Sequence, residues 1–272
     1  MTTNTTLSSK HRLLAIHAWL VYVFLYGPIA ILVIFSFNRS DFISSWEGFS
    51  LRWYAALWND DVMRECIVNS LIVGALATVI ATTIGTLAAL ALSRRQPYRG
   101  KTATSALLYL PIIIPEIVLG VALLTFFAVT QWKLSLLTIV IAHVTFSISY
   151  VAIVVRARLA GFDASLEEAA MDLGAGRLGT FFRVKLPLMM PGVIAGALLV
   201  FTLSIDDYVI TSFVAGPEST TLPLLIASKL HVKRDLPIVN AAATMLLLFT
   251  IVLIVISQTL LRDRRTQKES NP

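Results

Sequence analysis

Charged residues are scarce in this sequence, and cysteine is nearly absent. Only 14% of the 272 residues are Asp, Glu, Lys or Arg, against about 25% in a typical soluble domain. Cys66 is the single cysteine, which excludes an intrachain disulfide and a cysteine-rich metal site. The four histidines are scattered and show no metal-binding spacing; they are His11, His17, His143 and His231. The hydrophobic share of 57% must therefore face something other than water.

Nucleotide-binding and hydrolytic motifs are also missing. Gly100-Lys101-Thr102 matches the last three positions of a P-loop, but Arg95 stands where the first glycine of that motif belongs. The sequence has no HExxH helix and no recognisable Ser-His-Asp arrangement. We therefore expect a chain that is not an enzyme and that holds no cofactor, ATP or metal itself.

What the sequence does contain is long apolar runs. Four of them carry no Asp, Glu, Lys or Arg: 13–38, 66–93, 134–155 and 236–261. Two more are interrupted only by acids, 102–132 by Glu116 and 186–217 by Asp206 and Asp207. Each run reaches the roughly 20 residues that a helix needs to cross about 30 Å of hydrocarbon. The sequence therefore predicts an all-α integral membrane protein with six transmembrane helices in one domain, 13–261.

The basic residues indicate how such a domain is oriented. Fifteen of the 22 Lys and Arg residues fall in the tail 1–12, in the loops after the second and fourth spans, and in the tail 262–272. Because Lys and Arg mark cytoplasmic loops, we expect an N-in, C-in topology with two cytoplasmic tails. The net charge of +6 then belongs to these loops, with the lipid bilayer and not nucleic acid as the partner. The first run is longer than the apolar core of a signal peptide and lacks an Ala-x-Ala site, so we expect a retained helix.

The segment 156–187, between the fourth and fifth spans, is too patterned for a simple connector. Ser165-x-x-Glu168 has the form of a capping box that begins a helix, and Gly174 and Gly176 are expected to end it. A second amphipathic piece, 178–184, leads into the fifth span. One face of the first helix is apolar and is formed by Leu166, Ala169, Ala170 and Leu173. We expect a short cytoplasmic helix that either docks into a partner protein or only seals the end of the bundle.

The same loop resembles a family signature. Glu168-Ala169-Ala170, then Gly174, Val184 and Leu186-Pro187, match the pattern E-A-A-x3-G-x9-I-x-L-P of type I ABC importer permeases, with valine in place of the usual isoleucine. The resemblance implies the MetI-like fold of that family, with a coupling helix between helices 4 and 5 that inserts into a separate ATP-binding subunit. The docking residues that it implies are Glu168, Ala169, Ala170, Asp172 and Gly174.

Beyond the loop, nearly the whole chain resembles the spermidine/putrescine branch of this family, and in particular the second permease of putrescine importers. The matching stretches are 26–29, 35–38, 52–54, 142–146, 167–175, 201–207, 213–217 and 221–223. The resemblance implies a multi-pass protein of the bacterial inner membrane that pairs with a sister permease. It also implies two copies of an ATPase subunit that binds ATP and Mg, and a periplasmic polyamine-binding protein.

Three acids lie within the predicted spans, and no Lys or Arg lies there to neutralise them. A charge at the bilayer centre costs about 2.5–3.5 kcal/mol on insertion scales, so Glu116, Asp206 and Asp207 are candidates for a cationic substrate path. The alternatives are a buried structural acid for Glu116, and water or a basic residue of the sister permease for the two aspartates. Pro111 and Pro115 predict a kink in the third span.

Two further features have more than one interpretation. Trp53, on the predicted periplasmic side, is a candidate for a cation–π contact with an amine, although an interfacial aromatic belt explains most such residues. Gly192-x-x-x-Gly196 predicts a close helix contact, either within this chain or with the sister permease.

Other functions fit part of the pattern. An ion-coupled secondary carrier would use intramembrane acids, but it would leave the docking loop without a purpose. A membrane enzyme would need a cluster of catalytic polar residues near one interface, which the sequence lacks. An ABC permease for another organic solute or an iron chelate would differ only in its cargo.

Overall fold

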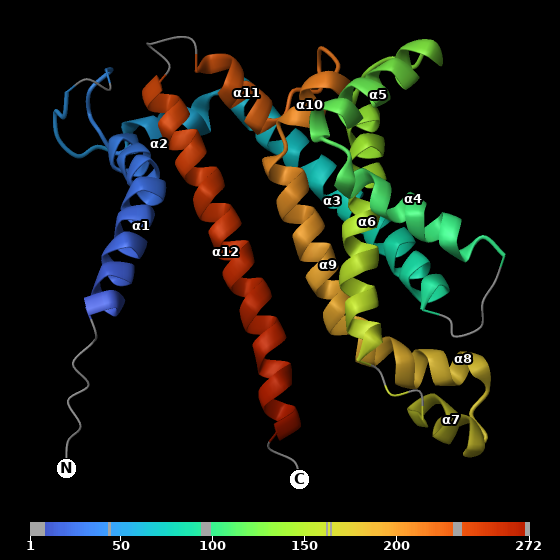
Figure 1. Cartoon of the computed structure of the whole chain (residues 1–272). Coiled ribbons are helices and arrows are strands. Elements are labelled where there is room, and N and C mark those ends of the chain that lie inside the picture. The colour runs from blue at the N-terminus through green and yellow to red at the C-terminus, as the bar shows by residue number, and fades with distance from the viewer. Residues whose placement is uncertain are drawn as a thin grey trace, which may run out of the picture. The chain divides into compact units, whose positions relative to one another are not determined.

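The computed structural model describes residues 9–42, 45–93, 99–161, 163, 165–230 and 236–269. Within these residues the regular structure is helical, with one isolated bridge between Asn38 and Phe49 (Figure 1). The chain divides into two compact units. The first is Met1–Asp60 with Lys229–Leu247, and the second is Asp61–Ser228 with Leu248–Pro272.

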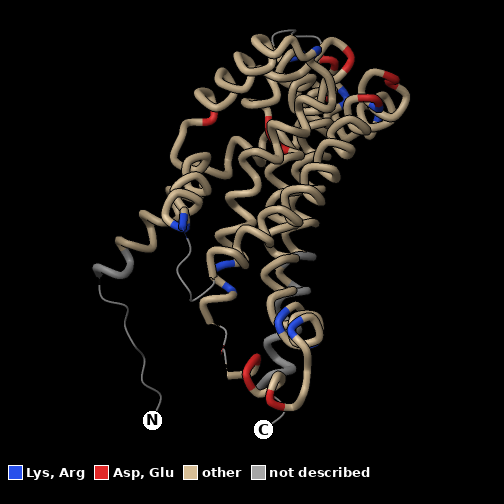
Figure 2. Tube along the Cα trace, turned by 90° about the vertical axis from the view of Figure 1, so that its right-hand side faces the viewer, with Lys and Arg blue, Asp and Glu red and all other residues tan. Residues whose placement is uncertain are grey.

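Among the described residues, five helices are long and apolar enough to cross a membrane, and a bent pair of helices makes a sixth span. The five are α1 (Ser9–Ser36), α3 (Asp61–Leu92), α6 (Leu136–Ala160), a continuous helix from Arg177 to Asp206, and α12 (Leu236–Glu269). The bent pair is α4 (Lys101–Ile113) and α5 (Glu116–Val129). The predicted all-α membrane fold is therefore confirmed, and Figure 2 shows charged residues mainly toward the ends of the long helices.

The third predicted span is interrupted more sharply than a kink. The axes of α4 and α5 differ by 109°. Ile114 and Pro115, which separate the two helices, have extended backbones with ψ of 131° and 137°. A proline disfavours the helical conformation in the residue before it, so Pro115 forces Ile114 out of the helix. The interruption lies where the sequence predicts it, but it divides the span 102–132 into two helices.

The fifth predicted span, 186–217, is wrong at its C-terminal part. Helix α9 (Leu186–Asp206) stops at Asp206, and two short helices follow, α10 (Val209–Val214) and α11 (Leu222–Lys229). Asp207 has an extended backbone, and its carboxylate accepts hydrogen bonds from the N–H groups of Ile210 at 3.3 Å and Thr211 at 2.8 Å. Such bonds satisfy the free N–H groups at a helix start, so Asp207 begins α10 and does not continue α9.

At its other end α9 is continuous with the loop before it. Helix α8 (Arg177–Thr180) passes into a π-helical turn, η1 (Phe181–Lys185), in which the Leu186 N–H bonds to the Phe181 carbonyl. Pro187 follows directly. In a regular α-helix its ring would crowd the carbonyl of the residue four positions earlier, and the wider π turn relieves that contact. The second piece predicted at 178–184 is thus helical, and it leads into α9 without a break in the helical backbone.

Helices α3, α6 and α9 form the centre of the second unit, and glycines bring them close together. A Cβ atom on Gly85 of α3 would lie 2.7 Å from Val151 Cβ of α6, and one on Gly196 of α9 would lie 3.4 Å from Val151 Cα. A Cβ on Gly192 would meet Arg158 of α6 at 2.8 Å. The Gly192-x-x-x-Gly196 face therefore packs within this chain, which decides between the two interpretations.

The opposite end of the second unit, away from α7 (Ser165–Asp172) and α8, is a separate packed platform of α5, α10 and the start of α6 (Figure 1). The Thr138 hydroxyl donates a buried hydrogen bond to the Val214 carbonyl at 2.8 Å. Gly216 abuts the Leu134 carbonyl so closely that no side chain would fit. These contacts hold the α5–α6 and α10–α11 connections together.

The first unit contains a short helix that the sequence analysis did not predict, α2 (Arg52–Asn59). Its Tyr54 hydroxyl lies 2.7 Å from Ser36 Oγ at the end of α1. The Asn38 side chain organises the connection between them, because its amide donates to the Ser45 carbonyl at 2.7 Å and its oxygen accepts from the Glu47 N–H at 2.9 Å.

Candidate functional site

The predicted loop helix is present as α7, but its first turn is capped differently from the prediction. The Asp163 carboxylate accepts a hydrogen bond from the Ser165 N–H at 2.9 Å. Among the described contacts, Ser165 and Glu168 exchange no side-chain bond. The predicted capping box between Ser165 and Glu168 is therefore wrong. Asp163, two positions before Ser165, supplies the capping oxygen.

Of the two glycines predicted to end this helix, Gly174 does so and Gly176 does not. Gly174 has φ of +86°, the left-handed conformation that glycine adopts without strain. Its N–H bonds to the Met171 carbonyl at 2.9 Å, and the Ala175 N–H bonds to the Ala170 carbonyl at 3.0 Å. This pair of bonds is a Schellman motif, which stops the helix. Gly176 instead precedes α8, with an extended backbone.

Helix α7 has no buried side chain among its residues. Leu173 just beyond it is 90% exposed and Leu178 of α8 is 76% exposed, while Glu168 also lies on the surface. Figure 1 shows α7 and α8 beyond the ends of α6 and α9, at the opposite end from α5 and α10. Apolar side chains gathered on an exposed surface mark an interaction site. This exposed surface of α7 and α8, with Glu168 on it, is the candidate docking face.

An ion pair that the sequence analysis missed joins this face to the membrane helix. Lys185 Nζ, at the end of η1, lies 2.6 Å from Glu167 Oε1 in the first turn of α7. The two side chains are 26% and 28% exposed. Residues this far apart in the sequence share no periodic pattern, so only the folded loop reveals the pair.

Two of the three predicted path acids are exposed and lack a cationic partner among the described residues. Asp206 is the last residue of α9, and the Thr250 hydroxyl of α12 lies 3.3 Å from both of its carboxylate oxygens. Glu116 is the first residue of α5, directly after the break between α4 and α5. Both carboxylates are therefore available to a cation that comes from outside the chain.

The third acid, Asp207, belongs to a buried cluster instead. Its Oδ2 lies 3.2 Å from His143 Nε2 of α6 and accepts a hydrogen bond from the Thr211 hydroxyl at 2.8 Å. His143 itself is fully buried and contacts Thr211 Oγ1 at 3.0 Å. The prediction that no basic residue within the spans neutralises this acid counted only Lys and Arg, and His143 is the partner it left out. The geometry favours a structural role for Asp207.

Trp53 is already engaged within the first unit. Its indole N–H donates to the Asn38 carbonyl at 2.9 Å, and the Arg52 guanidinium carbon lies 4.3 Å from the centre of its ring. One face of the ring thus contacts a cation of the same chain. The three predicted path acids belong to the second unit, so the structure does not bring Trp53 and these acids together within one unit.

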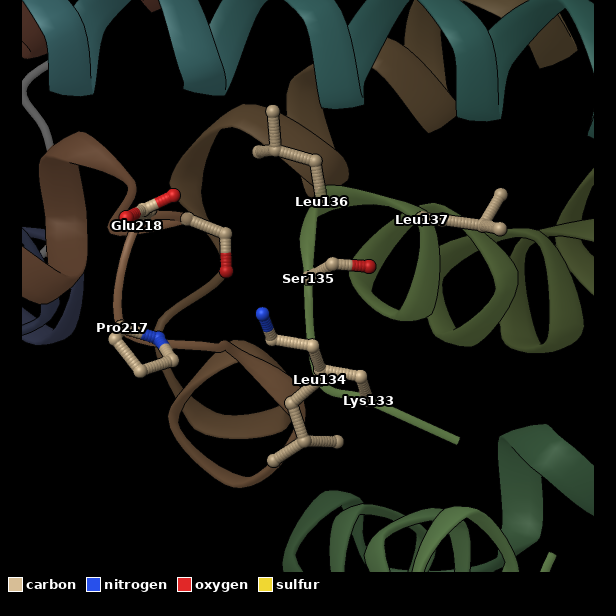
Figure 3. Close-up of a pocket in the computed structure, with 8 residues that line it drawn as sticks. Lys133, Leu134, Ser135, Leu136, Leu137, Pro217 and Glu218 are labelled. Carbon is tan, nitrogen blue, oxygen red and sulfur yellow. The ribbon is translucent and has the colours of Figure 1, made fainter. Parts of the chain in front are cut away.

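The platform carries a cavity of about 480 Å³ between the α5–α6 and α10–α11 connections. Figure 3 shows the Lys133 amine pointing into this space, with Glu218 on its other side. The cavity brings one ammonium and one carboxylate to the surface of the platform. Among the described residues, no group of three or more His, Cys, Asp or Glu is arranged to hold a metal.

Comparison with known proteins gives a consistent result. The profile of the family described as "Binding-protein-dependent transport system inner membrane component" matches residues 81–266. The chain is 44% identical to the putrescine transport system permease protein PotI of Escherichia coli K12, over 83% of this chain and 82% of that protein. It is 41% identical to the spermidine/putrescine transport system permease protein PotC of the same organism, over 90% of this chain and 92% of that protein.

A solved structure shares the fold. A chain of a bacterial ABC transporter involved in the import of alginate superposes with a TM-score of 0.72 over 93% of this chain and 94% of its own length. The sequence identity is 16%, so this likeness concerns the fold alone. The predicted importer-permease fold is thereby confirmed.

Proposed function

Because the chain belongs to the family of binding-protein-dependent transport system inner membrane components, we propose that it is a permease subunit of an ATP-driven importer for polyamines, putrescine or spermidine. The observation that carries this proposal is the 44% identity to PotI over four-fifths of both proteins. The chain is a multi-pass inner-membrane protein that forms the translocation path together with a sister permease. Two copies of an ATPase subunit bind ATP and Mg, and this chain contributes no catalytic group or cofactor.

The docking face supports the ATPase as a partner. Glu168, Ala169, Ala170 and Asp172 lie on α7, which has no buried residue, and the Schellman turn at Gly174 fixes where this helix ends. An exposed helix of small residues fits a cleft of a partner, because small side chains allow close approach. In this proposal the ATPase covers the face, and the exposed Leu173 and Leu178 lose contact with water.

The exposed carboxylates support a cationic cargo. Asp206 and Glu116 each lack a described cationic partner. The helix is also interrupted between α4 and α5, at Ile114 and Pro115. Proline has no N–H to donate, so a backbone carbonyl one turn earlier loses its helical hydrogen bond. Carboxylates and free carbonyls are the acceptors that an ammonium group needs. We assign weak, transient binding of the amine to Asp206 and Glu116, and leave Trp53 as a candidate at the outer mouth.

The proposed mechanism is alternating access. A periplasmic binding protein delivers the polyamine to the end that carries α5, α10 and the Lys133–Glu218 cavity. ATP binding draws the two ATPase subunits together and moves α7 with them, which opens the path toward the periplasm. Hydrolysis and product release return the path to the inward-open state.

The three acids are expected to respond differently to neutralisation. Asp206→Asn and Glu116→Gln should each lower the rate of polyamine uptake by about tenfold to 100-fold, since a hydrogen bond to a charged group contributes about 1.5–3 kcal/mol. Asp207→Asn should instead lower the amount of folded subunit, because the carboxylate that binds His143 and starts α10 is lost. Uptake and detergent-extracted subunit are measured in the same membranes. Unchanged uptake in Asp206→Asn or Glu116→Gln would remove that residue from the path.

The function itself is tested by uptake of labelled putrescine and spermidine into vesicles that carry the assembled complex, with and without ATP. ATP-dependent accumulation of either amine is the expected result and identifies the cargo. ATP-dependent activity that moves neither amine would keep the permease and point to another organic solute or an iron chelate. Uptake at the same rate with and without ATP would favour an ion-coupled carrier.

A further inference from the structure

The ion pair between Glu167 and Lys185 closes the coupling loop on itself. Glu167 lies in the first turn of α7, and Lys185 is the last residue of η1, directly before α9. Their side-chain atoms are 2.6 Å apart, and both side chains are about three-quarters covered. The loop between them contains the Schellman turn and α8. A partly covered pair of this geometry is screened less than an exposed one, so it holds α7 against the membrane helix.

The other contacts of α7 make this pair mechanically important. No side chain of α7 is buried, so the helix is not anchored by a hydrophobic core of its own. Beyond its last residue the chain passes through the left-handed Gly174 and the extended Gly176, so the helical backbone is interrupted between α7 and α8. A displacement of α7 would therefore be taken up by a change in this turn, and would not reach α9, unless α7 had a second connection to the membrane helix. Glu167 and Lys185 provide one.

Directly after Lys185 the chain continues as α9 without a break in the helical backbone. From Arg177 to Asp206 the helix is continuous, and its middle is packed against α6 through Gly192 and Gly196. A displacement applied at Lys185 is thus applied to α9. The far end of α9 carries Asp206, the exposed carboxylate assigned to the path. The pair therefore connects the docking face to the path through one helix.

We propose that the Glu167–Lys185 ion pair is a strut that transmits the movement of α7 to α9 and so couples ATP hydrolysis to transport. Glu167 and Lys185 are positioning residues: they touch neither cargo nor nucleotide. The inference rests on the proposed function, and it is distinct from the docking assigned to Glu168, whose carboxylate has no described partner in this chain.

The test is charge reversal in the complete complex in proteoliposomes, with ATP hydrolysis and labelled putrescine uptake measured together. Glu167→Lys and Lys185→Glu should each lower the uptake per ATP hydrolysed by about tenfold, within the range by which residues along a coupling network alter it. The double variant, which restores an ion pair with exchanged charges, should recover to within about twofold of the wild type. Arg183→Glu is the matched control, since it makes the same charge change on the same turn at an exposed side chain without a described partner.

Each result decides the question. Single variants with normal coupling, or a double variant as impaired as the single ones, would overturn the strut. Loss of the ATPase subunit from the purified single variants would also overturn it, because that result indicates a docking role. A wild-type complex that moves neither amine would be a failure of the proposed function instead. In that case hydrogen exchange of residues 165–172 in the complex still tests the strut: it should rise in both single variants and return in the double variant, and unchanged exchange would contradict the proposal.

Discussion

A complex that carries Glu168→Lys is expected to assemble in the membrane and yet to lose roughly 100-fold of its binding-protein-stimulated uptake. Glu168 is exposed on α7 and has no described partner within the chain, so its reversal leaves the fold of the subunit intact. The cost falls on the contact with the ATPase, where removing one partner of a buried charge pair costs about 2–5 kcal/mol. Stimulated ATP hydrolysis and uptake are measured on the purified complex, with subunit amounts determined on gels.

Glu168→Gln is the matched variant, because it keeps the size of the side chain and removes only the charge. It should lie between the wild type and Glu168→Lys in both activities. Wild-type coupling in Glu168→Lys would remove this residue from the docking face. It would favour the other interpretation of the loop, in which α7 only seals the cytoplasmic end of the bundle.

Gly85→Leu should cause a large loss of folded subunit. A Cβ atom at this position would lie 2.7 Å from Val151 Cβ and 2.9 Å from the Ile148 carbonyl, so α3 and α6 would have to separate to admit any side chain. Overpacking typically costs about 1–3 kcal/mol, and leucine adds three further carbons to the first clash. We expect at least about a tenfold decrease in the monodisperse subunit recovered in mild detergent.

Gly27→Leu is the control for this substitution. Gly27 is also in the interior of an apolar helix, but no residue that the structure describes lies within 4 Å of the Cβ position there. Leucine forms helices better than glycine, so this variant should be recovered at least as well as the wild type. Equal recovery of both variants would show that the contact between α3 and α6 is not tightly packed at Gly85.

The membrane helices could be predicted because the constraint on them is simple. A helix in hydrocarbon must be apolar for about 20 residues, and the apolar runs located the six spans, although the fifth was extended too far. The errors lie where side chains act on the backbone. Asp207 ends the fifth span because it bonds to N–H groups three and four residues ahead, although the sequence around it remains apolar. The π turn before Pro187 has no hydropathy signal at all.

The candidate site was predictable only in its local part. The spacing from Glu168 to Gly174 has a physical basis. Glu168 lies in the two-turn helix α7, and the left-handed Gly174 stops that helix. Partners on other elements were not predictable. His143 meets Asp207, and Lys185 meets Glu167, only because the helices and the folded loop bring them together. Pairing of this kind depends on the three-dimensional arrangement, which a single sequence does not encode in any periodic pattern.

The π turn at Phe181–Lys185 also sets the angular phase of everything after it. It holds about one residue more than an α-helical turn, and each residue of an α-helix advances the side chains by about 100° around the axis. Without the extra residue, Gly192 and Gly196 would face about 100° away from Val151 and Arg158, and bulkier side chains would point at α6. The turn therefore rotates the side chains of α9 about the helix axis. It determines which face of α9 packs against α6 and which face is turned toward the path.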